Sequence, residues 1–408
     1  MKTSTSKKRS FLSTNSAIKF VVILGIVSLF ADVTYEGGRS LSGQYLKILG
    51  AGATAVGIAA GAGEFLGYSL RLVSGYIADR TGKYWFMIFL GYALNLLAIP
   101  CLALVGQWQL AVLLLFIERI GKATRNPARD AMLAHATTQM GRGWGFGLHE
   151  ALDQIGALVG PLIVTLVLYF KNAGEASRSV YQTGFAVLLI PALLALTMLT
   201  IARYLYPRPS ELASKTPVVG TKGFNRRYWW YVAGAGLVAF GFADFPLMAY
   251  HLKGEDIAAD QWIPMFYALA MATDAIAALI FGRLFDRRGY PILLLAFSLS
   301  ALFAPLVFLG SLSVILIGLG LWGIGMGAQE SILRAGLADL APQEKRATAY
   351  GMYHTGFGIC WLLGSALMGF FYDHFLAGLI VVSITAQLAA LAVFAGLYRT
   401  DRHPTPTQ

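Results

Sequence analysis

The stretch GYIADRTGKYW, residues 75–85, stands between two long apolar segments, and GRLFDRRGYP, residues 282–291, stands between two others. A second pair of similar stretches has nearly the same separation: RGWGFGLHEALDQIGALVGP begins at Arg142, and RATAYGMYHTGFGICWLLGS begins at Arg346. The two offsets nearly agree, since 282 − 75 is 207 and 346 − 142 is 204. Within the second pair, Gly147 and Gly160 fall opposite Gly351 and Gly364. The chain is therefore a duplicated sequence with two homologous halves.

The composition predicts a membrane protein. The 408 residues are 57% hydrophobic and 13% charged, whereas a soluble domain has about 25% charged residues. Twelve apolar segments are long enough to span a bilayer: 17–46, 51–78, 84–105, 108–127, 142–170, 181–205, 229–251, 261–284, 290–310, 312–336, 345–371 and 377–398. Both cysteines, Cys101 and Cys360, lie in apolar runs, so we expect no disulfide framework, no metal site and no cofactor.

The predicted fold class is an all-α membrane protein with twelve transmembrane helices in two pseudo-symmetric six-helix bundles. The bundles cover residues 17–205 and 229–398, and a polar loop at 206–228 joins them. Residues 1–16 and 399–408 are predicted tails, and the apolar run near Ile18 lacks a signal-peptide cleavage pattern. Two facing repeats are typical of rocking transporters whose substrate site lies near the midplane between them.

The basic residues predict the orientation. With both ends in the cytoplasm, the opposite side keeps only Lys47, Lys171, Arg178 and Lys253. The inner side then holds Lys2, Lys7, Lys8, Arg9, Arg80, Lys83, the group within 203–227, Arg283, Arg287, Arg288, Lys345, Arg346, Arg399 and Arg402. The net charge of +11 is thereby explained by topology and contacts with anionic lipids rather than by nucleic-acid binding. We expect a monomer in the inner (cytoplasmic) membrane.

The loop GYIADRTGKYW resembles the signature loop of the major facilitator superfamily, usually written GxLaDrxGrk. Gly75, Asp79, Arg80, Gly82 and Lys83 match that motif, whereas Ile77 and Tyr84 depart from it. The runs RIGKATRNPARDA from Arg119 and FGLHEALDQIGALVGP from Phe146 are similar to a bacterial permease and efflux branch of that family. The resemblance covers nearly the whole chain and implies the twelve-helix transporter fold, but it says little of the substrate.

The signature loop is predicted to be a gate. A carboxylate at a helix edge accepts charge-assisted hydrogen bonds from arginine or helix N-terminal amides, so Asp79 could clamp the cytoplasmic side shut in one state. Asp286 and Arg287 would form a weaker copy in the second half. The alternative is a static topology anchor.

Charged residues inside the predicted spans are the strongest chemical signal. Asp32, Glu36 and Arg39 follow one helix face, beside Tyr35, and Glu64, Tyr68 and Arg71 repeat that spacing. The remaining charged candidates are Glu118, Arg119, Glu150, Asp153, Asp244, Asp274, Glu330 and Arg334. Each such charge costs about 2.5–3.5 kcal/mol or more at the bilayer centre, so these side chains should line a water-filled path or pair with one another.

Nine acids face four arginines in this set, which predicts an acidic cavity. A surplus carboxylate there can carry a proton, and we assign proton coupling to Asp32 and Glu36, with Arg39 contacting one of them. Structural pairing, for example of Glu330 with Arg334, is the alternative for any single acid. Gly156, Gly160 and Pro161 resemble part of an antiporter motif, but simple helix packing explains them equally well.

The sequence predicts a secondary transporter rather than an enzyme. No GxSxG, HExxH or GxGxxG motif stands in a suitable setting, and a phosphate-binding GxxxxGK[ST] loop is absent. We expect proton-coupled export of a small cationic or zwitterionic solute, with Tyr35, Trp322 and Trp361 available for stacking. Two alternatives stay open: proton-coupled uptake of an anionic or zwitterionic metabolite held by Arg39 and Arg71, and flipping of an amphiphilic lipid through an apolar lateral opening.

Overall fold

The computed structural model describes residues 14–137, 142–171, 177–207, 224–340 and 346–402, and its regular structure is helical throughout these ranges. The helices are α1 (Thr14–Ile48), α2 (Ala53–Thr81), α3 (Tyr84–Cys101), η1 (Leu102–Leu104), α4 (Trp108–Thr137), α5 (Arg142–Phe170), α6 (Arg178–Val187), α7 (Leu189–Leu205), α8 (Arg226–Phe240), α9 (Phe245–Gly254), η3 (Asp260–Trp262), α10 (Ile263–Arg288), α11 (Tyr290–Ser300), α12 (Phe303–Leu309), α13 (Leu312–Glu330), α14 (Ile332–Leu340), α15 (Arg346–His374) and α16 (Leu376–Arg402).

These helices form the twelve predicted spans, so the all-helical fold class is confirmed. Four spans are interrupted helix pairs: α6 with α7, α8 with α9, α11 with α12, and α13 with α14. Ten spans are apolar and long enough to cross a membrane by length and composition. The other two, α2 and α4, contain several charged residues, and some of these, among them Glu64, Arg71 and Arg119, line the cavity described below.

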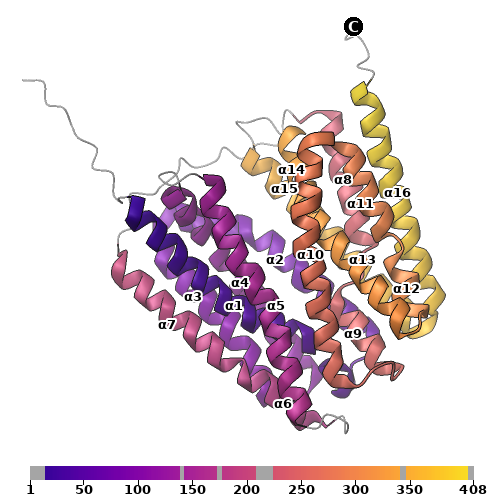
Figure 1. The fold of residues 1–408 in the computed structure, drawn as a ribbon, viewed down its shortest axis with the longest axis horizontal. Helices are drawn as coiled ribbons and strands as arrows, with labels where there is room; N and C mark the ends of the chain where they lie inside the picture. Colours follow the sequence, from indigo (N-terminus) through magenta and orange to yellow (C-terminus); the bar gives the residue numbers. More distant parts are fainter. Residues whose placement is uncertain (1–13, 138–141, 172–176, 208–223, 341–345, 403–408) are drawn as a thin grey trace, which may run out of the picture.

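Helices α1 to α7 gather on one side of the molecule and α8 to α16 on the other (Figure 1). The sequence repeat recurs in the packing of each group. A Cβ atom at Gly160 of α5 would lie 2.4 Å from the carbonyl oxygen of Val33 on α1, and one at Gly364 of α15 would lie 1.9 Å from that of Phe240 on α8. These contacts correspond at the repeat offsets, because 160 + 204 is 364 and 33 + 207 is 240. Both sites therefore require glycine for close helix approach.

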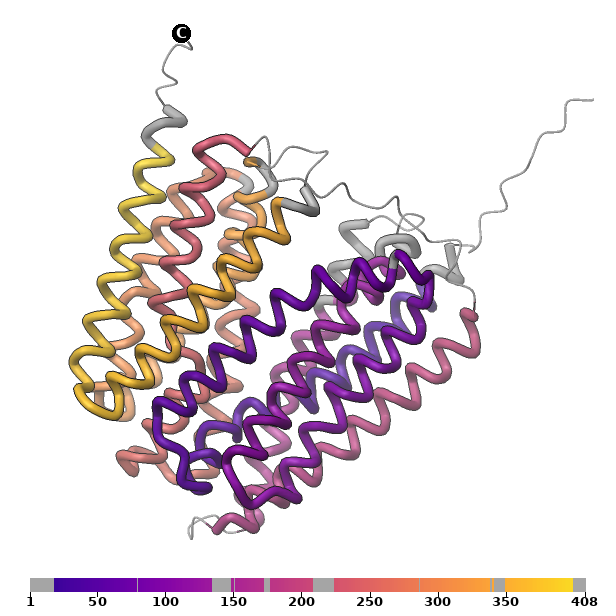
Figure 2. Tube along the Cα trace, turned by 180° about the vertical axis from the view of Figure 1, so that it is seen from behind, coloured from indigo at the N-terminus to yellow at the C-terminus, as the bar shows by residue number. Residues whose placement is uncertain are grey.

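The two groups of helices converge at one end and diverge at the other (Figure 2). At the convergent end, a Cβ at Gly43 of α1 would lie 2.0 Å from the carbonyl oxygen of Pro246 on α9. Asp373 of α15 accepts hydrogen bonds from the backbone amides of Ala53 (2.9 Å) and Thr54 (2.8 Å), and so caps α2 from the opposite half. The start of α1 and the end of α16 lie at the divergent end.

The seventh span breaks in its middle. Between α8 and α9, residues 241–244 leave the helix, and Asp244 then caps α9 by accepting a 2.8 Å hydrogen bond from the amide of Phe245. Pro246 in the first turn suits this start because its missing N–H is not needed there. The break places one carboxylate at a half-helix N-terminus deep inside the span Arg226–Gly254, an arrangement found in transporter binding sites.

Candidate functional site

A cavity of about 580 Å³ lies between the two groups of helices. Helices α1, α2, α4 and α5 line it on one side, and α10, α13, α14 and α15 on the other. Its charged lining residues are Asp32, Glu36, Arg39, Glu64, Arg71, Arg119, Lys122, Arg129, Asp130, Asp153, Asp274, Glu330 and Arg334, and His149 also reaches it.

The charged face of α1 lies where the sequence pattern places it. Asp32, Tyr35, Glu36 and Arg39 all line the cavity, and the three charged side chains are each only 8% exposed. Their spacing of four and three residues puts them on one helix face. Burial of three charges on one face requires charged or polar partners on the neighbouring helices.

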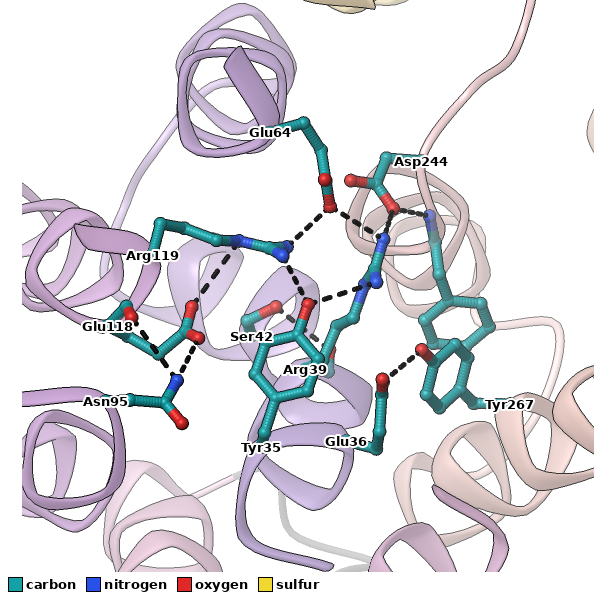
Figure 3. A network of polar contacts seen from close by, with 11 residues as sticks. Tyr35, Glu36, Arg39, Ser42, Glu64, Asn95, Glu118, Arg119, Asp244 and Tyr267 are labelled. Atoms are coloured by element: carbon teal, nitrogen blue, oxygen red, sulfur yellow. Dashed lines mark hydrogen bonds and ion pairs between the residues drawn. The ribbon is translucent and has the colours of Figure 1, made fainter. Parts of the chain in front are cut away.

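Arg39 connects the two halves of the molecule (Figure 3). Its Nη2 donates to Oδ1 of Asp244 at 2.5 Å and lies 3.5 Å from Oε1 of Glu64. The expectation that Arg39 contacts Asp32 or Glu36 is therefore wrong, because the break between α8 and α9 brings Asp244 to it instead. Sequence spacing describes one helix, whereas this partner comes from another span.

A second arginine extends the network within the first half. Arg119 pairs with Glu64 at 2.9 Å and with Glu118 at 3.4 Å, and it donates to the hydroxyl of Tyr35 (Figure 3). Asn95 donates to Oε1 of Glu118 at 2.6 Å. Glu118 and Asp244 border a separate hollow of about 30 Å³ next to Arg39 and Arg119 and do not line the main cavity.

Glu36 forms another polar bridge between the halves. The hydroxyl of Tyr267 on α10 donates to its Oε2 at 2.5 Å (Figure 3). Asp32 makes a long ion pair, with its Oδ1 3.9 Å from Nη2 of Arg125, and Lys122 and Asp153 are further charged neighbours. The two acids assigned to proton coupling thus have different surroundings.

Helix α4 supplies basic residues that the sequence analysis missed. Lys122 and Arg129 line the cavity, and Arg125 is buried at 1% exposure against the ring of Tyr92. Among the residues whose side chains the structure describes, the cavity lining therefore holds seven acids and six lysines or arginines, a smaller acidic surplus than expected. The sequence did carry a signal for this charged face of α4, because residues 118, 122, 125 and 129 recur at helical spacing. The run was interpreted instead as the charged end of a span.

The aromatic candidates differ in placement. Tyr35 and Trp361 line the cavity, and Lys122 lies 3.7 Å above the Tyr35 ring. Trp322 is fully buried, donates to the carbonyl of Ala243 and packs against Phe242, so its expected place in the cavity is wrong. Its side chain stabilises the break in the seventh span instead.

The remaining predicted cavity residues divide simply. Glu64, Arg71, Arg119, Asp153, Asp274 and Glu330 line the main cavity. Glu150 lies on α5, but its side chain is outside the described part of the structure. Among the described residues, no group of three or more His, Cys, Asp or Glu side chains is arranged to hold a metal ion.

The predicted gating loops lie at the divergent end. Gly82 ends α2 with a φ of 64°, and Gly289 follows α10 with a φ of 66°, which are backbone conformations that favour glycine. Arg80 donates to Tyr76 at 3.4 Å, while Lys83 and Arg287 are exposed. Gly75 lies beside Pro127 of α4. The side chains of Asp79 and Asp286 are outside the described part of the structure, so the clamp stays a prediction.

Gly156 and Gly160 have a packing role. A Cβ at Gly156 would lie 2.3 Å from the carbonyl oxygen of Leu29 on α1, one turn before the contact of Gly160 with Val33. This geometry confirms close helix packing as one use of the motif.

Two facing groups of helices around a charged central cavity define a secondary transporter. The chain belongs to the Major Facilitator Superfamily, whose sequence profile matches residues 21–328 and 245–408. An uncharacterized protein of Mycobacterium tuberculosis is 38% identical over 93% of this chain and 92% of its own length. An uncharacterized MFS-type transporter of Methanocaldococcus jannaschii is 25% identical over 91% of this chain and 94% of its own length.

More distant likenesses agree with this family. The multidrug resistance protein MdtH of Photorhabdus laumondii is 24% identical over 86% of this chain and 84% of its own length. Among solved structures, a mutant of the nucleoside transporter NupG superposes with a TM-score of 0.74 at 12% identity, over 93% of this chain and all of that chain. A POT family transporter in complex with 5-aminolevulinic acid gives 0.73 at 14% identity, covering 94% and 96%. These structures share the fold.

Proposed function

We propose that this transporter exports a small zwitterionic organic solute in exchange for protons. The observation that carries the proposal is the buried network joining the halves, in which Arg39 and Arg119 meet the carboxylates of Glu64, Glu118 and Asp244. Two guanidinium groups cannot neutralise three carboxylates, and Glu36, which accepts a hydrogen bond from Tyr267, adds a further acid to the network. Such a network favours uptake of a proton or of a cationic substrate group.

The cavity charges support a zwitterion rather than a simple cation. Seven acids and six lysines or arginines surround the space, so a purely cationic solute would approach basic side chains on several sides. A molecule with one ammonium and one carboxylate group could instead pair with both kinds of side chain. Tyr35, Tyr68 and Trp361 offer ring faces for its apolar part.

Asp32 and Glu36 are proposed as the proton-coupling acids. Asp32 faces the cavity, and Glu36 holds Tyr267 of the other half. Protonation of Glu36 would weaken its acceptor strength toward Tyr267, and protonation of Asp32 would alter the balance among Lys122, Arg125 and Asp153. Proton binding would thereby favour one arrangement of the halves over the other.

The direction of transport rests on orientation and on a distant likeness. If the divergent end faces the cytoplasm, as the distribution of basic residues predicts, the described state is open inward. The signature loop with Asp79 would then be an inner clamp in its released state. The name of the MdtH relative, a multidrug resistance protein, supports export.

A second function, uptake of an anionic or zwitterionic metabolite, is favoured by a different observation. Arg71, Arg129 and Arg334 also line the cavity and could hold a carboxylate or phosphate. The network would then couple proton entry to substrate entry.

Proteoliposome transport under an imposed pH gradient tests the proposal. Right-side-out vesicles containing the purified protein would be screened with matched zwitterionic, cationic and anionic solutes. We expect saturable movement of zwitterions against the direction of proton flow. Movement with the protons would favour the uptake alternative, and transport unaffected by the gradient would contradict proton coupling.

A further inference from the structure

A smaller hollow of about 20 Å³, here called the aromatic niche, lies beside the main cavity. Its walls come from α2, α13, α14 and α15. Five of its wall residues also line the main cavity, Tyr68 and Trp361 among them. A solute in the cavity therefore lies next to this niche.

Stacked and edge-on rings build one side of the niche. Tyr68 of α2 lies parallel to His354 of α15, with ring centroids 5.2 Å apart and an interplanar angle of 5°. Phe357 contacts Tyr68 edge-on, with ring centroids 5.7 Å apart, and it lies tilted by 52° against Trp361 at 5.5 Å. Planar walls of this kind favour a flat group, because aromatic faces attract rings and amide planes.

Three buried polar atoms on the niche walls have no hydrogen-bond partner among the described residues. They are Nε1 of Trp361, Oε1 of Gln329 and Nδ1 of His354. Trp361 is 2% exposed and Gln329 is 5% exposed. Gln329 already uses its amide nitrogen, which donates to the carbonyl of Gly325 at 3.1 Å. An indole N–H can only donate, and an amide oxygen can only accept.

Buried polar groups in folded proteins nearly always have a partner, so a ligand or water should supply the missing one. The volume of the niche suits a single water molecule or one polar edge of a larger ligand. The required edge offers an acceptor to Trp361 and a donor to Gln329. A planar ring that carries this edge can keep its body in the main cavity, against Tyr68 and Trp361.

We propose that the aromatic niche is a substrate subsite for an uncharged planar group with adjacent hydrogen-bond donor and acceptor, as in an amide, a lactam or a heteroaromatic ring. The inference rests on the proposed transport function and adds to it the chemical class of one substrate moiety. Charged groups of the same solute would remain in the main cavity with its acids and bases. Water occupies the niche when no substrate does, and a matching edge replaces both of its hydrogen bonds.

Fragment binding tests the subsite without any need for transport. The probes are 2-pyridone, which has adjacent N–H and C=O groups, and N-methyl-2-pyridone, which has the same ring without the donor. Saturation-transfer NMR would measure both at millimolar concentrations, the range expected for fragments, on the full chain in lipid nanodiscs. We expect 2-pyridone to bind wild type about tenfold more tightly than its methylated analogue, as for one lost hydrogen bond.

Two substitutions locate the binding. Trp361→Phe removes the donor and keeps a ring, while Gln329→Met removes the acceptor at similar volume; each should weaken 2-pyridone about tenfold. Trp230→Phe changes a half-exposed indole elsewhere and should leave binding unchanged. The comparison of the two probes on wild type needs no substitution and stands even where a variant fails to fold.

Equal binding of the two probes, absence of 2-pyridone binding, or 2-pyridone binding that survives both niche substitutions would overturn the subsite. Because binding is measured at equilibrium without a pH gradient, loss of proton coupling leaves this readout unchanged. Conversely, proton-driven transport with no probe discrimination would remove the subsite and leave the proposed function standing.

Discussion

The two acids of α1 illustrate how neighbours from other helices separate the roles of similar residues. Glu36 accepts a 2.5 Å hydrogen bond from Tyr267 across the interface, whereas Asp32 lies 3.9 Å from Arg125 and faces the cavity. The sequence predicted both acids on one face but could not predict these partners, because they come from spans remote along the chain. The same limit explains the missed partner of Arg39.

The first prediction concerns Asp32. Asp32→Asn keeps the side-chain shape and removes its titration, so pH-driven export should fall to background while solute binding at equilibrium persists. Proteoliposome efflux and equilibrium binding check the two parts. Full proton-coupled transport in Asp32→Asn, in Glu36→Gln and in the double variant would transfer the coupling role to Glu64, Asp153, Asp244 or Glu330.

The second prediction concerns Arg39. Its guanidinium reaches both Glu64 and Asp244, which a lysine ammonium cannot do with the same geometry. Arg39→Lys should therefore lower the free energy of unfolding by roughly 1–2 kcal/mol and slow transport, as measured by thermal unfolding and efflux. Arg80→Lys, at an exposed position with one hydrogen bond to Tyr76, is the matched control. Equal effects of the two substitutions would show that the contacts of Arg39 with Glu64 and Asp244 contribute neither to stability nor to the transport rate.

At the scale of helices, sequence periodicity predicted the membrane spans and their polar faces, but it did not predict where a span is interrupted. Twelve spans were expected, but the interruption at residues 241–244 was not, although Pro246 just after it has no N–H to bond to the carbonyl of Phe242 in a continuous helix. Contacts from other spans stabilise it: the indole of Trp322 donates to the carbonyl of Ala243 at 2.8 Å. The charged face of α4 was likewise hidden because charges also mark the end of a span.

The third prediction concerns helix packing between α1 and α5. Gly160→Ala adds a Cβ that would lie 2.4 Å from the carbonyl oxygen of Val33, so it should destabilise the protein by about 1–3 kcal/mol. Gly320→Ala adds a Cβ with nothing within 4 Å and should be neutral or stabilising by up to about 1 kcal/mol. Thermal unfolding of both variants provides the comparison. A Gly160→Ala variant as stable as the wild type in thermal unfolding would contradict the close packing of α1 and α5.

The fourth prediction concerns the cap that crosses the convergent end. Asp373→Ala removes the acceptor for the amides of Ala53 and Thr54, which should cost about 1 kcal/mol and favour separation of this end. Spin labels at Lys171 and Glu255, both exposed, should then show a larger population at long distance. His374→Ala removes a ring whose Nδ1 lies 2.9 Å from the carbonyl oxygen of Phe370 in the same helix, and it should leave the distances unchanged. Identical distance distributions in wild type and both variants would show that the Asp373 cap does not hold the convergent end closed.

At the scale of the whole molecule, the two halves share their helix packing but not their charged residues. The glycine contacts of Gly160 and Gly364 repeat, whereas the charges of α1 have no counterparts in α8. Asp244, at the break that follows α8, pairs with Arg39 of α1. The fold could therefore be predicted from the repeat, and the family from the signature loop at residues 75–85. The cavity chemistry could not, since it arises from unlike residues placed on like helices.

The last prediction concerns orientation, on which the assignment of the open end depends. The positive-inside distribution puts the divergent end in the cytoplasm, so a cysteine at Lys171 should react with an impermeant reagent added outside intact cells. A cysteine at Arg287 should react only after the membrane is opened. Both positions are exposed, so burial cannot explain a difference in labelling. Because the two positions lie at opposite ends of their spans, one experiment decides which end faces outward. The reverse pattern would make the described state open to the outside, and the proposed inner clamp at Asp79 would become an outer one.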